Sequence, residues 1–119
     1  MIYRFSALFA LLAPIVAQAD APEVVDATAR ESGSGWQISV TIRHPDTGWD
    51  HYADGWEVLD TDGNRLGFRE LLHPHETEQP FTRSLGGVAI PDGAESVEIR
   101  ARCSVDGWND ATYTLRLPN

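Results

Sequence analysis

Polar and apolar residues alternate with a period of two over most of the chain beyond residue 23, which is the pattern of β-strands that bury one face. In the clearest example, Trp36, Ile38, Val40 and Ile42 alternate with polar residues. Turn sequences rich in glycine, aspartate and proline separate these segments. The alternation predicts seven strands, at residues 24–32, 36–43, 55–59, 65–72, 81–90, 97–104 and 112–117.

Seven short strands with turns at near-regular spacing are typical of one architecture. They predict an all-β domain, a seven-stranded immunoglobulin-like or fibronectin-type β-sandwich. The first strand is expected at a sheet edge because its alternation is weak. The phase of the third strand predicts that Trp56 and Val58 face the core and Glu57 the opposite side. In the fourth strand Leu66 and Phe68 are expected to face inward.

The first nineteen residues have the pattern of a secretory signal peptide. Arg4 precedes an apolar run that ends in the small-residue cleavage signal Ala17-Gln18-Ala19. Residues 1–19 are therefore predicted to be a signal peptide and residues 20–119 a single β-sandwich domain that is periplasmic or secreted. The alternative is an uncleaved membrane anchor, although the run is shorter than the roughly 20 apolar residues that span a bilayer. After cleavage no stable membrane insertion is expected.

The chain is acidic, with a formal net charge of −9 at pH 7. Removal of residues 1–19, which contain Arg4 and no acidic residue, would lower this charge to −10. Nucleic acid and anionic lipid both require basic surfaces. The charge therefore argues against either as a partner.

If each strand reverses the direction of the last, the connections sort to two ends of the domain. The segments 44–55, 73–80 and 105–110 then share one end, and all four histidines of the chain lie in them. The other three connections are explained by turn-forming residues alone. Long loops with aromatic and titratable side chains on a rigid scaffold are where such domains bind ligands.

This loop end carries a candidate transition-metal site, because imidazole is the commonest metal ligand and clusters of histidine with cysteine or carboxylate suit iron, copper or zinc. The neighbouring aspartates could fix the imidazole tautomers. Alternatively, each histidine has a purely structural role. The candidate metal ligands are His44, His51, His73, His75, Cys103 and Asp106.

Cys103 is the only cysteine, so no disulfide can form within the chain. Strand alternation places its side chain on the core side, with Val97, Ile99 and Ala101. Three interpretations remain open for this thiol: a buried inert side chain, a metal ligand, or a partner in a disulfide between chains.

Two stretches carry a resemblance to a known family. His44-Pro45 followed by His51-Tyr52 and Trp56-Glu57-Val58-Leu59, together with the later segment 103–108 (Cys-Ser-Val-Asp-Gly-Trp), resemble motifs of the iron domain of superoxide reductase and desulfoferrodoxin. That domain is an immunoglobulin-like sandwich that holds iron by four histidines and an axial cysteine. The resemblance implies ligand positions at His44, His51 and Cys103.

The chain also departs from that family. Asp106 stands where the family has a histidine, and no histidine precedes His44 after the leader. These departures argue against superoxide reductase activity. Separately, the segments around residues 44–56 and 71–85 resemble a group of small exported bacterial proteins of unassigned function, which implies location and domain size only.

A second function is compatible with the same loops. Trp49, Tyr52 and Trp108 could serve a non-enzymatic interaction module by presenting aromatic surface to a protein or glycan partner. The alternative is that these rings close the end of the sandwich. No nucleophile elbow or phosphate-binding glycine loop is present, so the sequence gives no positive indication of an enzyme.

Overall fold

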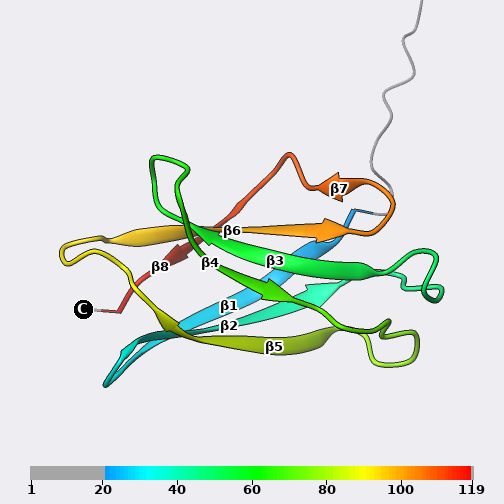
Figure 1. The fold of residues 1–119 in the computed structure, drawn as a ribbon, viewed down its shortest axis with the longest axis horizontal. Coiled ribbons are helices and arrows are strands. Elements are labelled where there is room, and N and C mark those ends of the chain that lie inside the picture. The colour runs from blue at the N-terminus through cyan, green and yellow to red at the C-terminus, as the bar shows by residue number, and fades with distance from the viewer. Residues whose placement is uncertain (1–20, 119) are drawn as a thin grey trace, which may run out of the picture.

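The computed structural model describes residues 21–118, and the predicted signal peptide lies outside them. The described residues form strands and loops without a helix (Figure 1). Accordingly, no helix in this part of the chain is long and apolar enough to cross a membrane. The strands are β1 (Glu23–Ser32), β2 (Gly35–Arg43), β3 (Ala53–Leu59), β4 (Arg65–Glu70), β5 (Phe81–Val88), β6 (Ser96–Cys103), β7 (Gly107–Trp108) and β8 (Tyr113–Arg116).

The strands form two antiparallel sheets. One has the order β1-β2-β5, and β1 lies at its edge as the alternation predicts. The other has the order β4-β3-β6-β7, with β8 also paired to β6. The chain crosses between the sheets after β2, after β4 and after β5. The prediction of an all-β domain is confirmed for residues 21–118. The strands in this range number eight instead of seven, because Gly107–Trp108 turns back to pair with the end of β6.

The core lies between the two sheets and consists of the inward row of each strand. Ile38, Val40 and Ile42 of β2 are at most 1% exposed, and in β6 the residues Val97, Ile99, Ala101 and Cys103 are buried while their neighbours are half-buried. The predicted phase of both strands is confirmed. Burial of the apolar rows is the main stabilising term for such a sandwich.

One predicted side-chain orientation in the β3–β4 hairpin, that of Phe68, is wrong. Phe68 pairs with Glu57 across the strands and therefore shares the outer face of the sheet, where it is 38% exposed. The cause is a register shift between Val58 and Leu59, which inserts an extra residue opposite β3 and reverses the phase of β4. Leu66 does pack against the core, as predicted.

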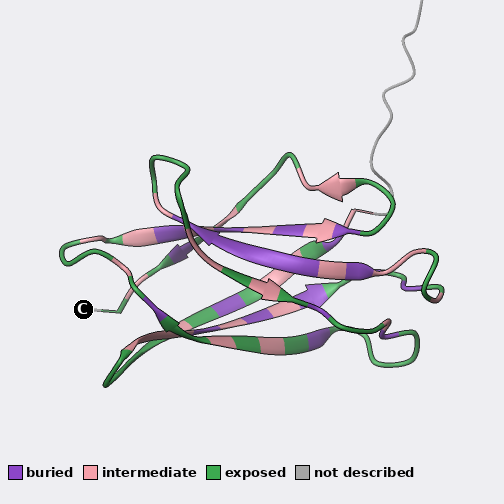
Figure 2. Cartoon of the chain, in the orientation of Figure 1, coloured by how far each residue is buried: buried purple, intermediate pink, exposed green. Residues whose placement is uncertain are grey.

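Glu57 faces away from the core as predicted, yet it is only 2% exposed. Its carboxylate accepts bonds from Arg65 Nε at 3.2 Å and Arg100 Nε at 3.0 Å. Both guanidinium groups also lie over the ring of Trp108 in β7. The two arginines and the Trp108 side chain thus cover Glu57 on the outer face of β3. Figure 2 shows β3 buried along nearly its whole length.

The connections sort to two ends, as strand reversal predicts. The β2–β3, β4–β5 and β6–β7 connections lie together at the right of Figure 1, and the β1–β2, β3–β4 and β5–β6 connections lie toward the left. All four histidines are therefore carried by one end of the domain. This arrangement positions the candidate site.

The β1–β2 turn offers a direct test of the backbone geometry. Gly35 has φ 138°, and a Cβ atom there would lie 2.9 Å from the carbonyl oxygen of Val88. We expect Gly35→Ala to lower the free energy of unfolding by about 1–3 kcal/mol through backbone strain and a clash. Gly33→Ala is the matched control, because no atom lies within 4 Å of its Cβ position. Urea unfolding of both variants measures the difference, and equal stabilities would contradict the turn geometry.

Candidate metal centre

The β2–β3 loop folds back on itself and brings two histidines together. The backbone N–H of Thr47 donates to the carbonyl of His51 at 3.0 Å, and the N–H of His51 donates to the carbonyl of Gly48 at 3.2 Å. The imidazole of His44, directly after β2, consequently lies edge-on to that of His51, with ring centroids 4.8 Å apart. The seven-residue separation in sequence is closed by backbone hydrogen bonds within the loop.

Cys103 completes the cluster from the opposite side. It is the last residue of β6 and pairs with Ala53 at the start of β3, which places its side chain beneath the loop. The sulfur lies 3.6 Å from Nε2 of His51. One potential ligand atom from each of His44, His51 and Cys103 lies within 4.8 Å of the other two, and no other such group of three occurs in residues 21–118.

The orientation of His44 is set by a buried carboxylate. Its Nδ1 lies 2.5 Å from Oδ1 of Asp46, and both side chains are fully buried. Because the carboxylate is an acceptor, the neutral imidazole of His44 carries its proton on Nδ1 and its lone pair on Nε2. Nε2 of His44 is buried and has no hydrogen-bond partner. A carboxylate that fixes the tautomer of an imidazole in this way is the usual support of a metal-binding histidine.

The sulfur of Cys103 has polar neighbours in the β6–β7 turn. The backbone N–H of Asp106 lies 3.3 Å from Sγ, and the Asp106 carboxylate accepts from the thiol at 3.7 Å. Gly107, at φ 73°, allows the tight turn that aims this N–H at the sulfur. The thiol is fully buried. This burial removes Cys103 from reach of another chain, so a disulfide between chains does not fit the structure.

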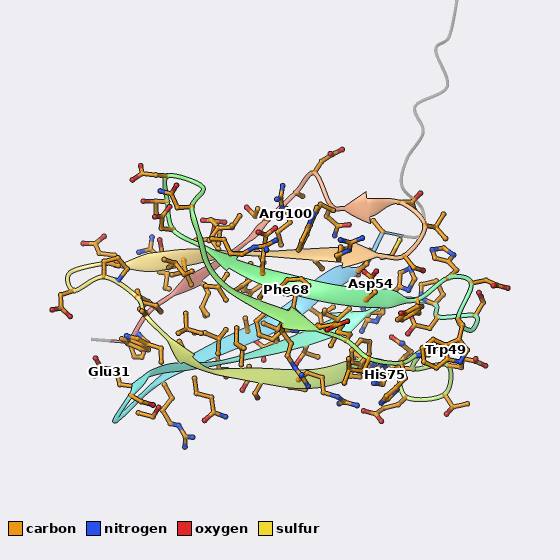
Figure 3. The ribbon with its side chains drawn as sticks, viewed as in Figure 1. Glu31, Trp49, Asp54, Phe68, His75 and Arg100 are labelled. Carbon is orange, nitrogen blue, oxygen red and sulfur yellow. The ribbon has the colours of Figure 1, made fainter. Side chains whose placement is uncertain are left out.

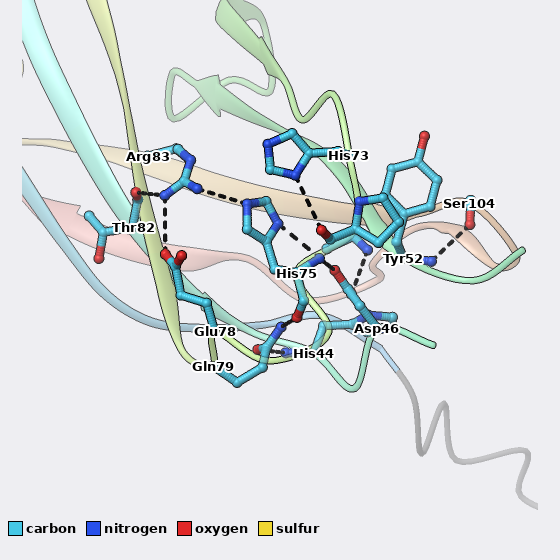
Figure 4. Close-up of polar contacts among 12 residues, drawn as sticks. His44, Asp46, Tyr52, His73, His75, Glu78, Gln79, Thr82, Arg83 and Ser104 are labelled. Carbon is cyan, nitrogen blue, oxygen red and sulfur yellow. Dashed lines mark hydrogen bonds and ion pairs between the residues drawn. The ribbon is translucent and has the colours of Figure 1, made fainter. Parts of the chain in front are cut away.

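Asp46 also joins the β4–β5 connection to the site. Its carboxylate accepts bonds from the backbone N–H groups of Ala53 at 3.0 Å and His75 at 2.7 Å (Figure 4). Gln79 adds a second link, because its amide accepts from the His44 N–H and donates to the His75 carbonyl. The buried carboxylate of Asp46 and the side-chain amide of Gln79 therefore hold the two loops together.

His73 and His75 form a separate pair. His75 stacks on Phe81 with ring centroids 3.9 Å apart, and its Nε2 accepts from Arg83 at 2.8 Å. His73 is exposed and lies 4.6 Å from His75, centroid to centroid. The structure brings neither into the cluster of His44, His51 and Cys103. The carboxylate of Asp106 contacts the sulfur but also lies outside that group.

Burial lowers the pKa of His75, and the charges of Arg83 and His73 lower it further against the opposing effects of Asp46 and Glu78. In the unfolded chain His75 therefore takes up a proton near its ordinary pKa of about 6.5. In the folded chain the same imidazole takes up a proton only at a lower pH. We expect the free energy of unfolding to fall as pH falls below about 6.5, by at most about 1.4 kcal/mol per pH unit for this group.

This pH effect is measured by urea unfolding between about pH 7.5 and 5.5 in the presence of a chelator. His75→Gln should flatten the profile relative to the unsubstituted chain. Superimposable profiles would show that His75 does not hold its neutral form in the fold.

The aromatic residues proposed for partner binding lie in two places. Trp49 is 68% exposed at the tip of the β2–β3 loop (Figure 3). Its ring packs edge-on against that of Tyr52. Trp108 lies instead in β7 on the outer face of the sheet, against Phe68. The structure thus joins Trp49 with Tyr52 and places Trp108 with the arginines of the outer face.

Sequence reasoning did not assign individual roles to Asp46, Gln79 or Arg83. The contact between Asp46 and His44 could have been suspected from one feature of the sequence. Asp46 follows His44 by two residues in a loop where the chain must turn back. Gln79 and Arg83 act through contacts with segments 35 and 8 residues away, which no local pattern indicates.

Comparisons with known proteins find a relative but no matching family model. A protein of Halomicrobium mukohataei named "Putative lipoprotein" is 44% identical to this chain over 86 residues, which is 71% of this chain and 42% of that protein. The chain thus spans about two-fifths of the length of this relative. No family model and no solved structure matches. The resemblance to the superoxide reductase iron domain is therefore not supported by a family match.

Proposed function

We propose that this chain is an exported β-sandwich protein that binds one transition-metal ion through His44, His51 and Cys103. Export is supported by the expected leader at residues 1–19 and by the name of the relative, which describes that protein as a lipoprotein. The domain would then be residues 20–119 in the periplasm or outside the cell. Two antiparallel sheets with crossovers between them support an immunoglobulin-like sandwich.

One observation carries the metal proposal: the lone pair on Nε2 of buried His44 has no partner, although Nδ1 is firmly bonded to Asp46. A buried polar atom left unsatisfied costs about 1–3 kcal/mol. Binding a cation at this nitrogen would remove that cost. The neighbouring donors are another imidazole and a thiol, which are the groups that transition metals prefer.

The spacing of the donors supports the same conclusion. In a tetrahedral site with bonds of about 2.3 Å to sulfur and 2.0–2.1 Å to nitrogen, the two atoms lie about 3.5 Å apart. The distance between Cys103 Sγ and His51 Nε2 is 3.6 Å. The three donors come from two structural elements fixed by backbone hydrogen bonds, so small side-chain shifts suffice for binding.

Metal binding requires the thiol of Cys103 to lose its proton and both imidazoles to be neutral. The backbone N–H of Asp106 would stabilise the thiolate by hydrogen bonding. In this proposal the backbone N–H of Asp106 supports the sulfur, and the backbone N–H of His75 holds the Asp46 carboxylate from the neighbouring loop. The donor set fits iron, copper or zinc and excludes calcium and magnesium, which take oxygen ligands.

The test is equilibrium dialysis of the exported protein against copper, zinc and ferrous ions under reducing conditions. We expect about one ion per chain, and at least a roughly tenfold weaker affinity in His44→Gln and Cys103→Ser. His73→Ala is the control, because His73 is exposed and outside the cluster. Circular dichroism checks that each variant folds. Equal affinities in all four proteins would overturn the proposal.

The exposure of Trp49 favours a second candidate, a protein- or glycan-interaction module that uses Trp49 and Tyr52. Trp49 is 68% exposed, and large apolar side chains at a loop tip are typical of recognition surfaces. Under this proposal Trp49→Ala abolishes capture of the partner without changing the fold. A variant such as Cys103→Ser that loses metal binding but still captures the partner would show that the two functions are separate.

A further inference from the structure

The donor set of the proposed centre consists of two imidazole nitrogens and one sulfur, and we propose that the ion it selects is copper, which it can hold as Cu(II). This inference rests on the proposed function, because it names the ion for the same three residues. Trigonal shells of two histidines and one cysteine are characteristic of copper sites.

The number of protein ligands argues against a closed zinc site. Structural zinc takes four protein ligands in a tetrahedron. Within residues 21–118 the cluster offers three, His44, His51 and Cys103, and no carboxylate joins it. Asp106 is directed to the sulfur as a hydrogen-bond partner. A three-ligand shell matches copper without a fourth strong ligand.

Burial argues against an ion of high coordination number. The side chains of His44 and Cys103 are 0% exposed, and only His51 reaches the surface in part. An octahedral or five-coordinate ion would need two or three further ligands from water or protein. Because His44 and Cys103 are both fully buried, little space remains next to them for such ligands. The site therefore favours low coordination.

Local charge favours a divalent ion over a monovalent one. Binding of an ion would make the sulfur of Cys103 a thiolate. The buried carboxylate of Asp46 lies behind the same site, bonded to His44 Nδ1. A divalent cation neutralises both in a region where uncompensated charge is costly. Cu(II) meets this requirement.

The state of the thiol supports Cu(II) as well. Thiols reduce Cu(II) when two thiolates of neighbouring molecules join in a disulfide, which transfers one electron to each of two copper ions. Cys103 is the only cysteine and its side chain is fully buried. Two such sulfurs cannot meet without unfolding, so the Cu(II)–thiolate bond is protected from this reaction.

The test is a titration of the reduced, metal-free protein with Cu(II), followed by visible absorption. We expect an intense thiolate-to-copper charge-transfer band that saturates at about one ion per chain and persists with equimolar zinc. The band should be absent in Cys103→Ser, which checks that sulfur binds the ion, and unchanged in His73→Ala. Asp46→Asn should weaken copper binding roughly ten- to hundredfold.

Four results would count against these assignments. Stoichiometric replacement of copper by zinc, or weak absorption that Cys103→Ser leaves unchanged, would overturn the choice of copper. Binding of about one zinc or ferrous ion through the same residues with no copper band would do the same and would leave metal binding standing. Binding of all ions unaffected by His44→Gln and Cys103→Ser would overturn the proposed function itself.

Discussion

Replacing Asp46 by alanine is expected to lower the free energy of unfolding by about 3–5 kcal/mol, because it removes the buried carboxylate that accepts hydrogen bonds from three donors. The Asp46 carboxylate accepts from His44 Nδ1 and from the backbone N–H groups of Ala53 and His75. In the alanine variant these three donors remain buried without partners. Urea unfolding by fluorescence measures the loss.

The control for Asp46→Ala is Asp50→Ala in the same loop. Asp50 is exposed, so its replacement should change stability by less than about 0.5 kcal/mol. A similar small effect for both variants would show that Asp46 does not hold the two loops together. A large effect for Asp46 alone supports the buried link between the β2–β3 and β4–β5 connections.

The second large effect is expected from the metal ion. An ion that binds the folded chain only, at a free concentration of 100 times its Kd, raises the free energy of unfolding by about 2.7 kcal/mol. Thermal unfolding at a series of ion concentrations should show a Tm that rises steadily with concentration. The effect should vanish in Cys103→Ser, where the sulfur donor is lost, and persist in His73→Ala.

Unchanged Tm with added ion would contradict metal binding by the folded state. A rise of equal size in Cys103→Ser would instead indicate binding at surface groups elsewhere. Because the chain has a formal net charge of −9, weak binding to exposed carboxylates is the main background, and the cysteine variant corrects for it.

The strands were predictable because burial of one face leaves a period of two in the sequence. The rows of β2 and β6 show this directly, since each has a fully buried side and a polar side. The orientation of Phe68 was not predictable, because a register shift opposite Leu59 depends on strand pairing. The burial of Glu57 was missed for a similar reason: two arginines and Trp108 cover it from other strands.

The gathering of the histidines at one end was predictable from strand reversal alone, and it is confirmed. Their division into two pairs was not, because it depends on the side chain of Asp46, which binds His44 through one oxygen and the His75 backbone through the other. The depth of Cys103 followed from alternation. Its contact with His51 depends on the fold of the β2–β3 loop, whose hydrogen bonds leave no periodic signal.

The most direct test of the central claim is X-ray absorption spectroscopy of the protein loaded with about one ion per chain. Coordination by His44, His51 and Cys103 predicts a first shell with one sulfur scatterer and two imidazole nitrogens, and loss of the sulfur in Cys103→Ser. A shell of oxygen and nitrogen without sulfur in the unsubstituted chain would contradict the account.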